Sequence, residues 1–446
     1  MFKKVLIANR GDIAIRILRA CKEMGIKTVA VHSVVDESLM HVKFADESVC
    51  IGDNRSADSY LNVSAILSAA ELTGADALHP GVGFLSEKEK FAEMVELHGI
   101  KFIGPDPKHI AMMGDKIIAK KTMSDLGIPV VKGSDGEVKS VEEAKQIAEE
   151  AGYPVLFKAA NGGGGKGMKV ANSPDEIENA FKMAKAEAKA NFGDDSVYME
   201  RYLANPRHIE IQIIADSYGN VVHLGERDCS IQRNHQKLLE ESPSIALTQE
   251  KRDEIGEIVR KAIKGLGYVG VGTLEFLYEN GEFFFMEMNT RLQVEHSVSE
   301  MITGIDIVKE QIRIAAGEKL SFSQEDIQFS GHAIEFRINA VHPETFIPSP
   351  GRIDELYFPG GNGVRVDSHI YRNYVIPPYY DSLIAKIIIH GKDREECLAK
   401  SRCALDELVI DGVFTTAGLH KKLVRNQDIN SGDYNIHWLE KNLKDL

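Results

Sequence analysis

The first hundred residues alternate short apolar runs with a helical spacing of apolar positions. Residues 5–8 (Val-Leu-Ile-Ala) and 28–31 (Thr-Val-Ala-Val) are short apolar runs typical of buried strands. Between them, apolar residues recur every three or four positions from Ile13 to Met24, which predicts a helix ending at Gly25. This order predicts a parallel βαβ unit.

Residues 75–80 and 101–105 resemble further strands of the same sheet. We therefore expect a doubly wound N-terminal domain over residues 1–114, in an overall mixture of α/β and α+β architecture.

The middle of the chain, residues 115–329, predicts a second domain. A helix begins at Lys116, and residues 130–203 predict a small α+β unit that we expect to act as a mobile lid. In this unit, helices at 141–151 and 173–190 flank a strand, a glycine loop and a strand at 155–171. Further elements are expected at 209–215 (strand), 219–224 (strand), 250–265 (helix), 272–289 (hairpin) and 299–316 (helix).

Past Ser330 the pattern changes to short strands and turns rich in Pro and Gly, followed by helices near 394–409 and at the C-terminus. It predicts a third, α+β domain over residues 330–446.

Composition narrows the function classes. A formal charge of -14 argues against nucleic acid as a main partner, but a few lysines in a cleft can still hold a nucleotide. No apolar stretch is long enough to span a bilayer. The five cysteines are scattered and include no Cys-x-x-Cys pair, which predicts a reducing, cytoplasmic location without disulfides or a zinc site.

Residues 161–167 (Asn-Gly-Gly-Gly-Gly-Lys-Gly) form a candidate phosphate-binding loop. Gly163, Gly164 and Gly165 allow backbone N–H groups to approach the phosphates of ATP closely. The run is not a Walker A motif, because Met168 follows it, and it joins two strands. Lys158 just before it supports a mobile flap over a nucleotide; the alternative is a flexible linker.

The hairpin at 272–289 carries two acids, Glu275 and Glu287, in otherwise apolar strands, where unpaired burial would be costly. With Asn289 they supply the oxygen ligands that Mg²⁺ prefers. A two-residue Asn-Gly loop would place the two acids on opposite faces, whereas a three-residue loop over residues 279–281 would place them on one face. The metal interpretation therefore predicts the three-residue loop; the alternative is a surface strand with solvated acids.

Arg291, Gln293 and Glu295 alternate directly after the hairpin, so an extended segment would present all three on one face. An arginine clamps small anions and a neighbouring glutamate accepts a proton, which suits bicarbonate. The alternative is a surface ladder of ion pairs.

Three further residues carry open interpretations. Lys237 follows a polar stretch at 226–233 and is a candidate phosphate contact. Cys229 in that stretch is expected to be a structural thiol, since no general base is implied beside it. Arg337, in the alternating strand at 332–338, also suits a simple ion pair with Glu335 or another acid.

These residues resemble the biotin carboxylase family of the ATP-grasp superfamily, over essentially the whole chain. The resemblance is carried by short motifs, at residues 7–11 (Ile-Ala-Asn-Arg-Gly), 79–81 (His-Pro-Gly), 84–87 (Phe-Leu-Ser-Glu), 113–116 (Met-Gly-Asp-Lys), 161–167, 226–230 (Glu-Arg-Asp-Cys-Ser), 288–291 (Met-Asn-Thr-Arg) and 293–296 (Gln-Val-Glu-His). The last stretch is highly specific.

The resemblance implies an N-terminal doubly wound domain, a central ATP-grasp domain and a C-terminal α+β domain. It implies ATP, two Mg²⁺ or Mn²⁺ ions, and biotin as a carrier-bound substrate. The implied ATP site comprises Lys116, Lys158, Glu200, Arg201, Leu203, His208, Gln232, His235, Leu277, Glu275, Glu287 and Ile436. The metal residues are Glu275 and Glu287, with Asn289 beside them.

The resemblance also assigns the second half of the site. Arg291, Gln293, the Val294 backbone and Glu295 would hold bicarbonate, with Glu295 as the base. Lys237 would stabilise carboxyphosphate, and Arg337 the biotin enolate near Val82.

By the same resemblance, we expect a homodimer that serves a biotin carboxyl carrier protein in trans and carboxyltransferase subunits, as in acetyl-CoA carboxylase and fatty acid synthesis. No Ala-Met-Lys-Met biotinylation sequence occurs. Three alternatives stay open: a pyruvate or other acyl-CoA carboxylase, another ATP-grasp ligase, and a silent nucleotide-binding subunit.

The chain departs from the family pattern at four positions. Val82 replaces a Tyr near the biotin pocket, Ser297 a Pro, Arg201 a Lys, and Asn362 an aromatic residue of the dimer interface. The other residues expected at that interface are present, namely Arg19, Glu23 and Arg365.

Overall fold

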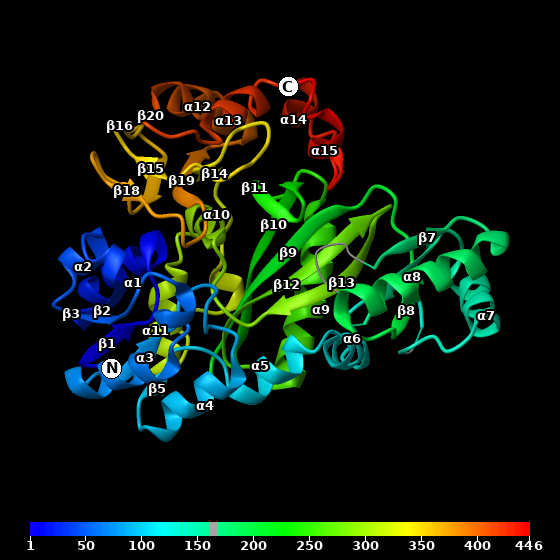
Figure 1. Cartoon of the computed structure of the whole chain (residues 1–446), viewed down its shortest axis with the longest axis horizontal. Helices are drawn as coiled ribbons and strands as arrows, with labels where there is room; N and C mark the ends of the chain where they lie inside the picture. Colours follow the sequence, from blue (N-terminus) through cyan, green and yellow to red (C-terminus); the bar gives the residue numbers. More distant parts are fainter. Residues whose placement is uncertain (135, 161–166) are drawn as a thin grey trace.

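The computed structural model describes residues 1–134, 136–160 and 167–446. Its N-terminal region contains a five-stranded parallel sheet in the order β3-β2-β1-β4-β5 (Figure 1). The strands are β1 (Lys4–Ile7), β2 (Lys27–Ser33), β3 (Glu47–Gly52), β4 (Ala77–His79) and β5 (Lys101–Phe102). The helices are α1 (Gly11–Glu23), α2 (Met40–Phe44), α3 (Val63–Thr73), α4 (Glu89–Leu97) and α5 (Pro107–Gly114).

Both faces of this sheet are buried. Successive side chains of a strand point to opposite faces, and those of β1 pack in two different hydrophobic clusters. Val5 and Ile7 pack in one hydrophobic cluster with Ile17 of α1. Leu6 packs in another with Ile66 of α3. The predicted parallel, doubly wound arrangement is thus confirmed.

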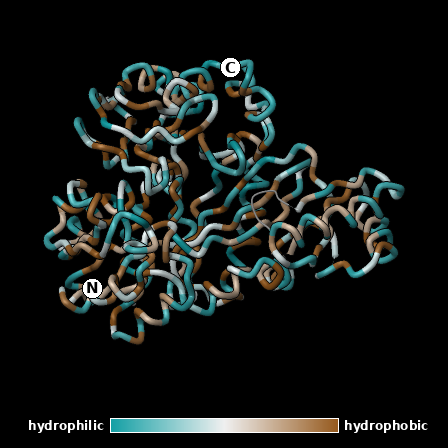
Figure 2. The backbone as a smooth tube through the Cα atoms, viewed as in Figure 1, coloured by the Kyte–Doolittle hydropathy of each residue, from teal (hydrophilic) through white to brown (hydrophobic). Residues whose placement is uncertain are grey.

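A smaller unit extends from the body of the molecule, at the right of Figure 1. It contains a three-stranded sheet in the order β7-β6-β8 and its own hydrophobic core. Its elements are α7 (Val141–Ala151), β6 (Val155–Ala159), β7 (Lys169–Ala171), α8 (Ile177–Phe192) and β8 (Val197–Arg201), and α6 (Lys116–Asp125) precedes it. Hydrophobic and hydrophilic residues alternate along its helices (Figure 2), as amphipathic packing on one face requires. We call this unit, residues 130–203, the lid unit.

The largest element is an eight-stranded sheet in the order β13-β12-β9-β10-β11-β14-β19-β17. Its strands are β9 (Arg207–Ala215), β10 (Val221–Arg233), β11 (Gln236–Ser242), β12 (Gly270–Glu279), β13 (Glu282–Asn289), β14 (His332–Asn339), β17 (Val364–Ser368) and β19 (Leu383–Gly391). The helix α9 (Gln249–Leu266) packs on it. The C-terminal strands therefore continue the central sheet, with β11 paired antiparallel to β14.

The rest of the C-terminal region covers one end of this sheet (Figure 1). It contains β15 (Gly351–Arg352), β16 (Glu355–Tyr357), β18 (Val375–Ile376), β20 (Val409–Asp411), α12 (Arg394–Glu407), α13 (Ala417–Leu423), α14 (Gln427–Ser431) and α15 (Trp438–Asn442). None of the helices in the described part of the chain combines the length and apolar character that a membrane span needs.

Two expected boundaries are wrong. The helix predicted over 299–316 is two helices, α10 (His296–Thr303) and α11 (Ile307–Ala315). Gly304 ends α10 with φ +71°, and the Asp306 side chain caps α11 by accepting from the Lys309 N–H.

The strand predicted over 219–224 continues as β10 to residue 233, so the polar stretch after it is a buried strand. Its charges are paired inside the protein. Glu226 accepts from Arg252, Arg227 donates to Glu210, and Asp228 accepts from Arg207.

Candidate functional site

A cavity of about 910 Å³ lies between the lid unit, the eight-stranded sheet and the C-terminal loops. All of the predicted site residues that the structure describes line it, namely Val82, Lys116, Lys158, Glu200, Arg201, Leu203, His208, Gln232, His235, Lys237, Glu275, Leu277, Glu287, Asn289, Arg291, Gln293, Val294, Glu295, Arg337 and Ile436. Gly163, Gly164 and Gly165 lie outside the described residues. The fold thus gathers in one cavity residues that are more than 300 positions apart in the chain.

The hairpin β12–β13 has a two-residue loop, so the predicted three-residue loop is wrong. Glu279 pairs with Glu282, and Asn280 and Gly281 between them have φ of 53° and 84°, as a type I′ turn requires. The register then shifts, with Met286 as the extra residue, so that Glu275 pairs directly with Glu287. The bulge, and not the loop, brings the two acids to one face.

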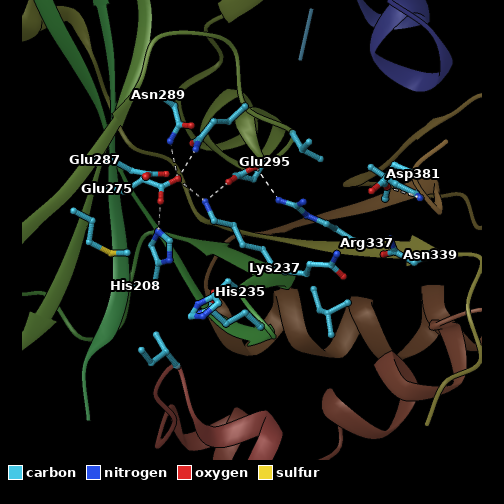
Figure 3. Close-up of a pocket in the computed structure, with 18 of the residues that line it drawn as sticks. His208, His235, Lys237, Glu275, Glu287, Asn289, Glu295, Arg337, Asn339 and Asp381 are labelled. Atoms are coloured by element: carbon cyan, nitrogen blue, oxygen red, sulfur yellow. Dashed lines mark hydrogen bonds and ion pairs between the residues drawn. The ribbon is translucent and has the colours of Figure 1, made fainter. Parts of the chain in front are cut away.

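Glu275 receives donors from several sides (Figure 3). Its Oε1 accepts from Asn289 Nδ2 at 2.9 Å, Gln293 Nε2 at 2.7 Å and Lys237 Nζ at 3.0 Å. His208 Nε2 lies 3.0 Å from its Oε2. Burial would raise the pKa of Glu275, but Lys237 and His208 outweigh burial and hold that pKa well below its usual range. Glu275 is therefore ionised.

Glu287 differs from its partner. Burial, with the negative charge of Glu275 in second place, raises the pKa of Glu287. Two carboxylates side by side, one of them destabilised in its charged form, fit a bound hard cation, which would relieve their repulsion. The donor set of Glu275, Glu287 and the Asn289 amide therefore suits Mg²⁺ or Mn²⁺.

Glu295 lies between two cations (Figure 3). Lys237 Nζ donates to its Oε1 at 2.5 Å, and an Arg337 guanidinium nitrogen donates to its Oε2 at 2.8 Å. The side chain is buried, with 2% of the residue surface exposed. Burial would raise the pKa of Glu295, but Lys237, Arg337 and Arg227 outweigh burial and hold the pKa well below its usual range. Glu295 is thus an ionised acceptor at the centre of the cavity.

The segment from Arg291 to Glu295 is irregular and ends in a turn, so the predicted extended segment is wrong. The side chains of Arg291, Gln293 and Glu295 nevertheless all line the cavity. Arg291 donates to Glu87 at 2.7 Å and to Asn289 at 2.9 Å, and Gln293 donates to Glu275. The partners come from other segments, so the three residues do not form a ladder among themselves.

The lid unit and the helix α6 before it form a separate ion-pair group. Lys158 and Lys120 donate to the two oxygens of Glu200 at 2.5 and 2.7 Å. Burial would lower the pKa of Lys158, but Glu200 outweighs burial and raises it. Lys158 is therefore a cation at the cavity wall.

Several buried charged residues of the site were not predicted. Arg227 of β10 donates to five side chains, those of Glu210, Gln212, Thr273, Gln293 and Ser299. Glu210 of β9 also accepts from Lys237 at 2.6 Å, and Glu240 of β11 accepts from Arg337. The available signal was the alternation Ile-Glu-Ile-Gln-Ile at 209–213, which marks one polar face on a strand.

Other predicted positions have clear places. Cys229 is fully buried, and burial raises the pKa of its thiol well above the usual range, which suits a structural thiol. Arg337 pairs with Glu240 and Glu295, whereas Glu335 accepts from Ser297. Asn362 is exposed.

Family models match the three regions of the chain. "Biotin carboxylase, N-terminal domain" matches residues 1–110. "Carbamoyl-phosphate synthase L chain, ATP binding domain" matches residues 115–323, and "Biotin carboxylase C-terminal domain" matches residues 335–441.

Individual relatives match over nearly their full length. The biotin carboxylase of Haemophilus influenzae is 57% identical over 444 residues, which cover 99% of each chain. A biotin carboxylase structure from Campylobacter jejuni, in a complex described as β,γ-ATP, has a TM-score of 0.93 and 50% identity, covering 99% of each chain.

A third relative is the biotin carboxylase domain dimer of the Hydrogenobacter thermophilus 2-oxoglutarate carboxylase, solved with MgADP, ADP and bicarbonate. It has a TM-score of 0.92 and 51% identity, covering 99% of this chain and 98% of that one. With three domains, a cavity built on the ATP-grasp sheet and identity above 50% over the whole length, this chain belongs to the biotin carboxylase family.

Proposed function

We propose that this chain uses ATP and bicarbonate to carboxylate biotin on a separate carrier protein, as the first half-reaction of acetyl-CoA carboxylase. The observation that carries the proposal is the position of Glu295, an ionised carboxylate between Lys237 and Arg337, in the same cavity as the acid pair Glu275 and Glu287. A base, an anion clamp and a cation site are thus adjacent.

In the first step, Arg291, Gln293 and the Val294 N–H hold bicarbonate while Glu295 takes the proton of its hydroxyl group. The resulting oxygen attacks the γ-phosphorus of ATP, which breaks the bond to ADP and gives carboxyphosphate. Lys237, which contacts three carboxylates in this structure, would stabilise the negative charge of carboxyphosphate with its ammonium group. Positioning and charge stabilisation supply most of the rate in such transfers.

Glu275, Glu287 and Asn289 would hold the divalent cations. When bound, these ions neutralise charge on the phosphates of ATP during transfer. Lys116, Lys158 and the residues of the adenine side, among them His208, Gln232, His235 and Ile436, would orient the nucleotide beneath the lid unit.

In the second step, carboxyphosphate breaks down to CO₂ and phosphate, and the phosphate takes the proton from the ureido nitrogen of biotin. Arg337 faces the cavity from β14 and would stabilise the negative charge on the ureido oxygen. The ureido nitrogen then attacks CO₂. Val82 on the cavity wall would pack near biotin.

The partners follow from this chemistry. Biotin attached to a carrier chain has to enter the cavity from outside, and the carboxyl group then passes to carboxyltransferase subunits. The five cysteines are free, which supports the cytoplasm as its location. We also propose a homodimer through the surface of Arg19, Glu23 and Arg365. The relative from 2-oxoglutarate carboxylase supports a different acceptor of the carboxyl group as the second candidate function.

The test is an assay of ADP release by the purified full-length chain. The proposal expects release to require bicarbonate and to be stimulated by free biotin. Release without bicarbonate would indicate another ATP-grasp ligase, and no release with any of these substrates would indicate a silent nucleotide-binding subunit.

A further inference from the structure

A buried lysine lies behind the turn that carries Glu295. Lys386 of β19 has 1% of its surface exposed, and it is not among the residues that line the cavity. Its Nζ donates to the backbone oxygen of Val294 at 2.5 Å and to Ser297 Oγ at 3.2 Å. The carboxylates of Glu335 and Asp367 lie farther away, at 3.7 and 3.9 Å. The shortest contact of this ammonium is therefore a backbone carbonyl of the candidate bicarbonate site.

The carbonyl of Gln293, the residue before Val294, also has a fixed partner. Gln293 O accepts from the His296 N–H at 3.4 Å and lies 2.8 Å from His296 Nδ1. His296 is fully buried, so both carbonyls of the turn are directed into the protein. In a trans peptide the C=O and N–H groups point in opposite directions, so the N–H groups of Val294 and Glu295 are directed away from these partners.

Those two N–H groups are available for a ligand. Neither Val294 N nor Glu295 N donates a hydrogen bond to another residue in the described part of the chain. Both residues line the cavity. Two successive N–H groups beside an arginine form a site for a small anion. Holding the carbonyls of the turn therefore also orients its anion-binding side.

We propose that Lys386 is a positioning residue for the bicarbonate site. By fixing the Val294 carbonyl it keeps two N–H groups and the Glu295 carboxylate directed at the bound anion. The inference rests on the proposed function, because bicarbonate is the anion named there. The competing interpretation is that Lys386 only neutralises Glu335 and Asp367, which would affect stability without selecting one substrate.

The experiment compares two Michaelis constants in the ADP-release assay on the full-length protein. Lys386→Met removes the ammonium and keeps a chain of similar length. We expect the KM for bicarbonate to rise about tenfold or more and the KM for ATP to stay within about twofold of wild type. Ser401→Ala is the matched control, since Ser401 is a buried polar residue of α12, which packs on β19. Its two KM values should both stay unchanged.

Ser297→Ala is a milder second variant. The Ser297 hydroxyl accepts from Lys386 and donates to Glu335, so its loss loosens Lys386 without removing the charge. We expect the KM for bicarbonate to rise about threefold with the KM for ATP unchanged.

The inference is overturned if Lys386→Met leaves the KM for bicarbonate at the wild-type value, or raises both KM values equally. If Lys386→Met does not fold, an unchanged KM for bicarbonate in Ser297→Ala overturns it. A wild-type chain without bicarbonate-dependent ADP release would instead contradict the proposed function.

Discussion

Two glutamates on opposite sides of Glu295 have opposite titration behaviour. Glu275 lies on the Lys237 side and Glu240 on the Arg337 side, and both are buried on strands of the same sheet. Lys237 and His208 outweigh burial at Glu275 and lower its pKa. At Glu240, burial raises the pKa to about 8. Arg337 opposes this rise, but the negative charges of Glu335 and Glu295 add to it.

The difference follows from the neighbours of each carboxyl group. Glu275 has an ammonium, two amide donors and an imidazole around it, whereas Glu240 lies opposite Glu335 in the strand pairing. On the metal side the Glu275 carboxylate stays ionised and attracts cations. On the Arg337 side a protonated Glu240 leaves the positive charge of Arg337 for Glu295 and for an anionic substrate. Two glutamates of one sheet thus have pKa values shifted in opposite directions by their neighbours.

Glu295 joins the two sides, so its removal should have the largest effect. For Glu295→Ala we expect both bicarbonate-dependent ADP release and biotin carboxylation to fall by about 10³-fold, because no base remains and two cations lose their shared partner. The measurement is initial rates with saturating substrates. Glu96→Ala, an exposed acid paired with Lys101, is the control. A variant that retains a tenth of either rate would contradict the assignment.

Arg337→Ala should separate the two sides. We expect biotin carboxylation to fall by about 10²-fold, because the charge opposite the ureido oxygen is lost. ADP release should fall less, because Lys237 still holds Glu295. Both rates are measured on one preparation. An equal loss of both would show that the two sides act as one unit, and wild-type carboxylation of free biotin would make Arg337 structural.

Glu287→Gln tests the metal side. We expect the Mg²⁺ concentration for half-maximal activity to rise about tenfold, because one of two paired carboxylates is lost. The matched control is Glu282→Gln, an exposed acid on the same strand. If the two variants respond to Mg²⁺ alike, Glu287 does not hold the ion.

Glu240→Gln should have the smallest effect and a defined pH dependence. The raised pKa of Glu240, about 8 in the folded state, means that the folded protein holds a proton that the unfolded chain has released. This stabilisation is full below the ordinary glutamate pKa and is lost as pH rises through about 8. Gln does not titrate, so the unfolding free energy of the variant relative to wild type should grow from about pH 5 to about pH 8. Urea unfolding across this range measures it, and a flat difference would contradict the raised pKa.

The sequence was most informative about the site where a charged residue stands among apolar ones. Glu275 and Glu287 stand out as acids in apolar strands, and their meeting on one face is confirmed. The bulge at Met286 that aligns the two acids was not predicted, because it leaves the local pattern of apolar residues intact. In contrast, Gly304 and Asp306 carried the ordinary signals of a helix end and a helix start, but the apolar spacing continues across them.

Pairing between distant strands could not be predicted. The alternation in residues 332–338 predicts a strand, and β14 confirms it, yet nothing local indicates that β11 is its neighbour. For the same reason Glu210 and Glu240 were missed. The strand of Glu210 alternates like a half-exposed one, and β11 places Glu240 beside a second acid, Glu241, as a solvated strand would. Only the assembled sheet shows that both faces are covered.

The shared sheet has a consequence for cutting the chain. The exposed loop around Gln328 separates the ATP-grasp and C-terminal family matches, but β11 and β14 pair across it from Leu239–Phe336 to Ser242–Ala333. A nick there would yield two fragments, each with a bare strand edge that has lost its complement. Such fragments would behave as the two halves of a split protein. Each regains a paired strand edge only when β11 and β14 pair again, and ATP turnover would then measure the reassembly of the two fragments.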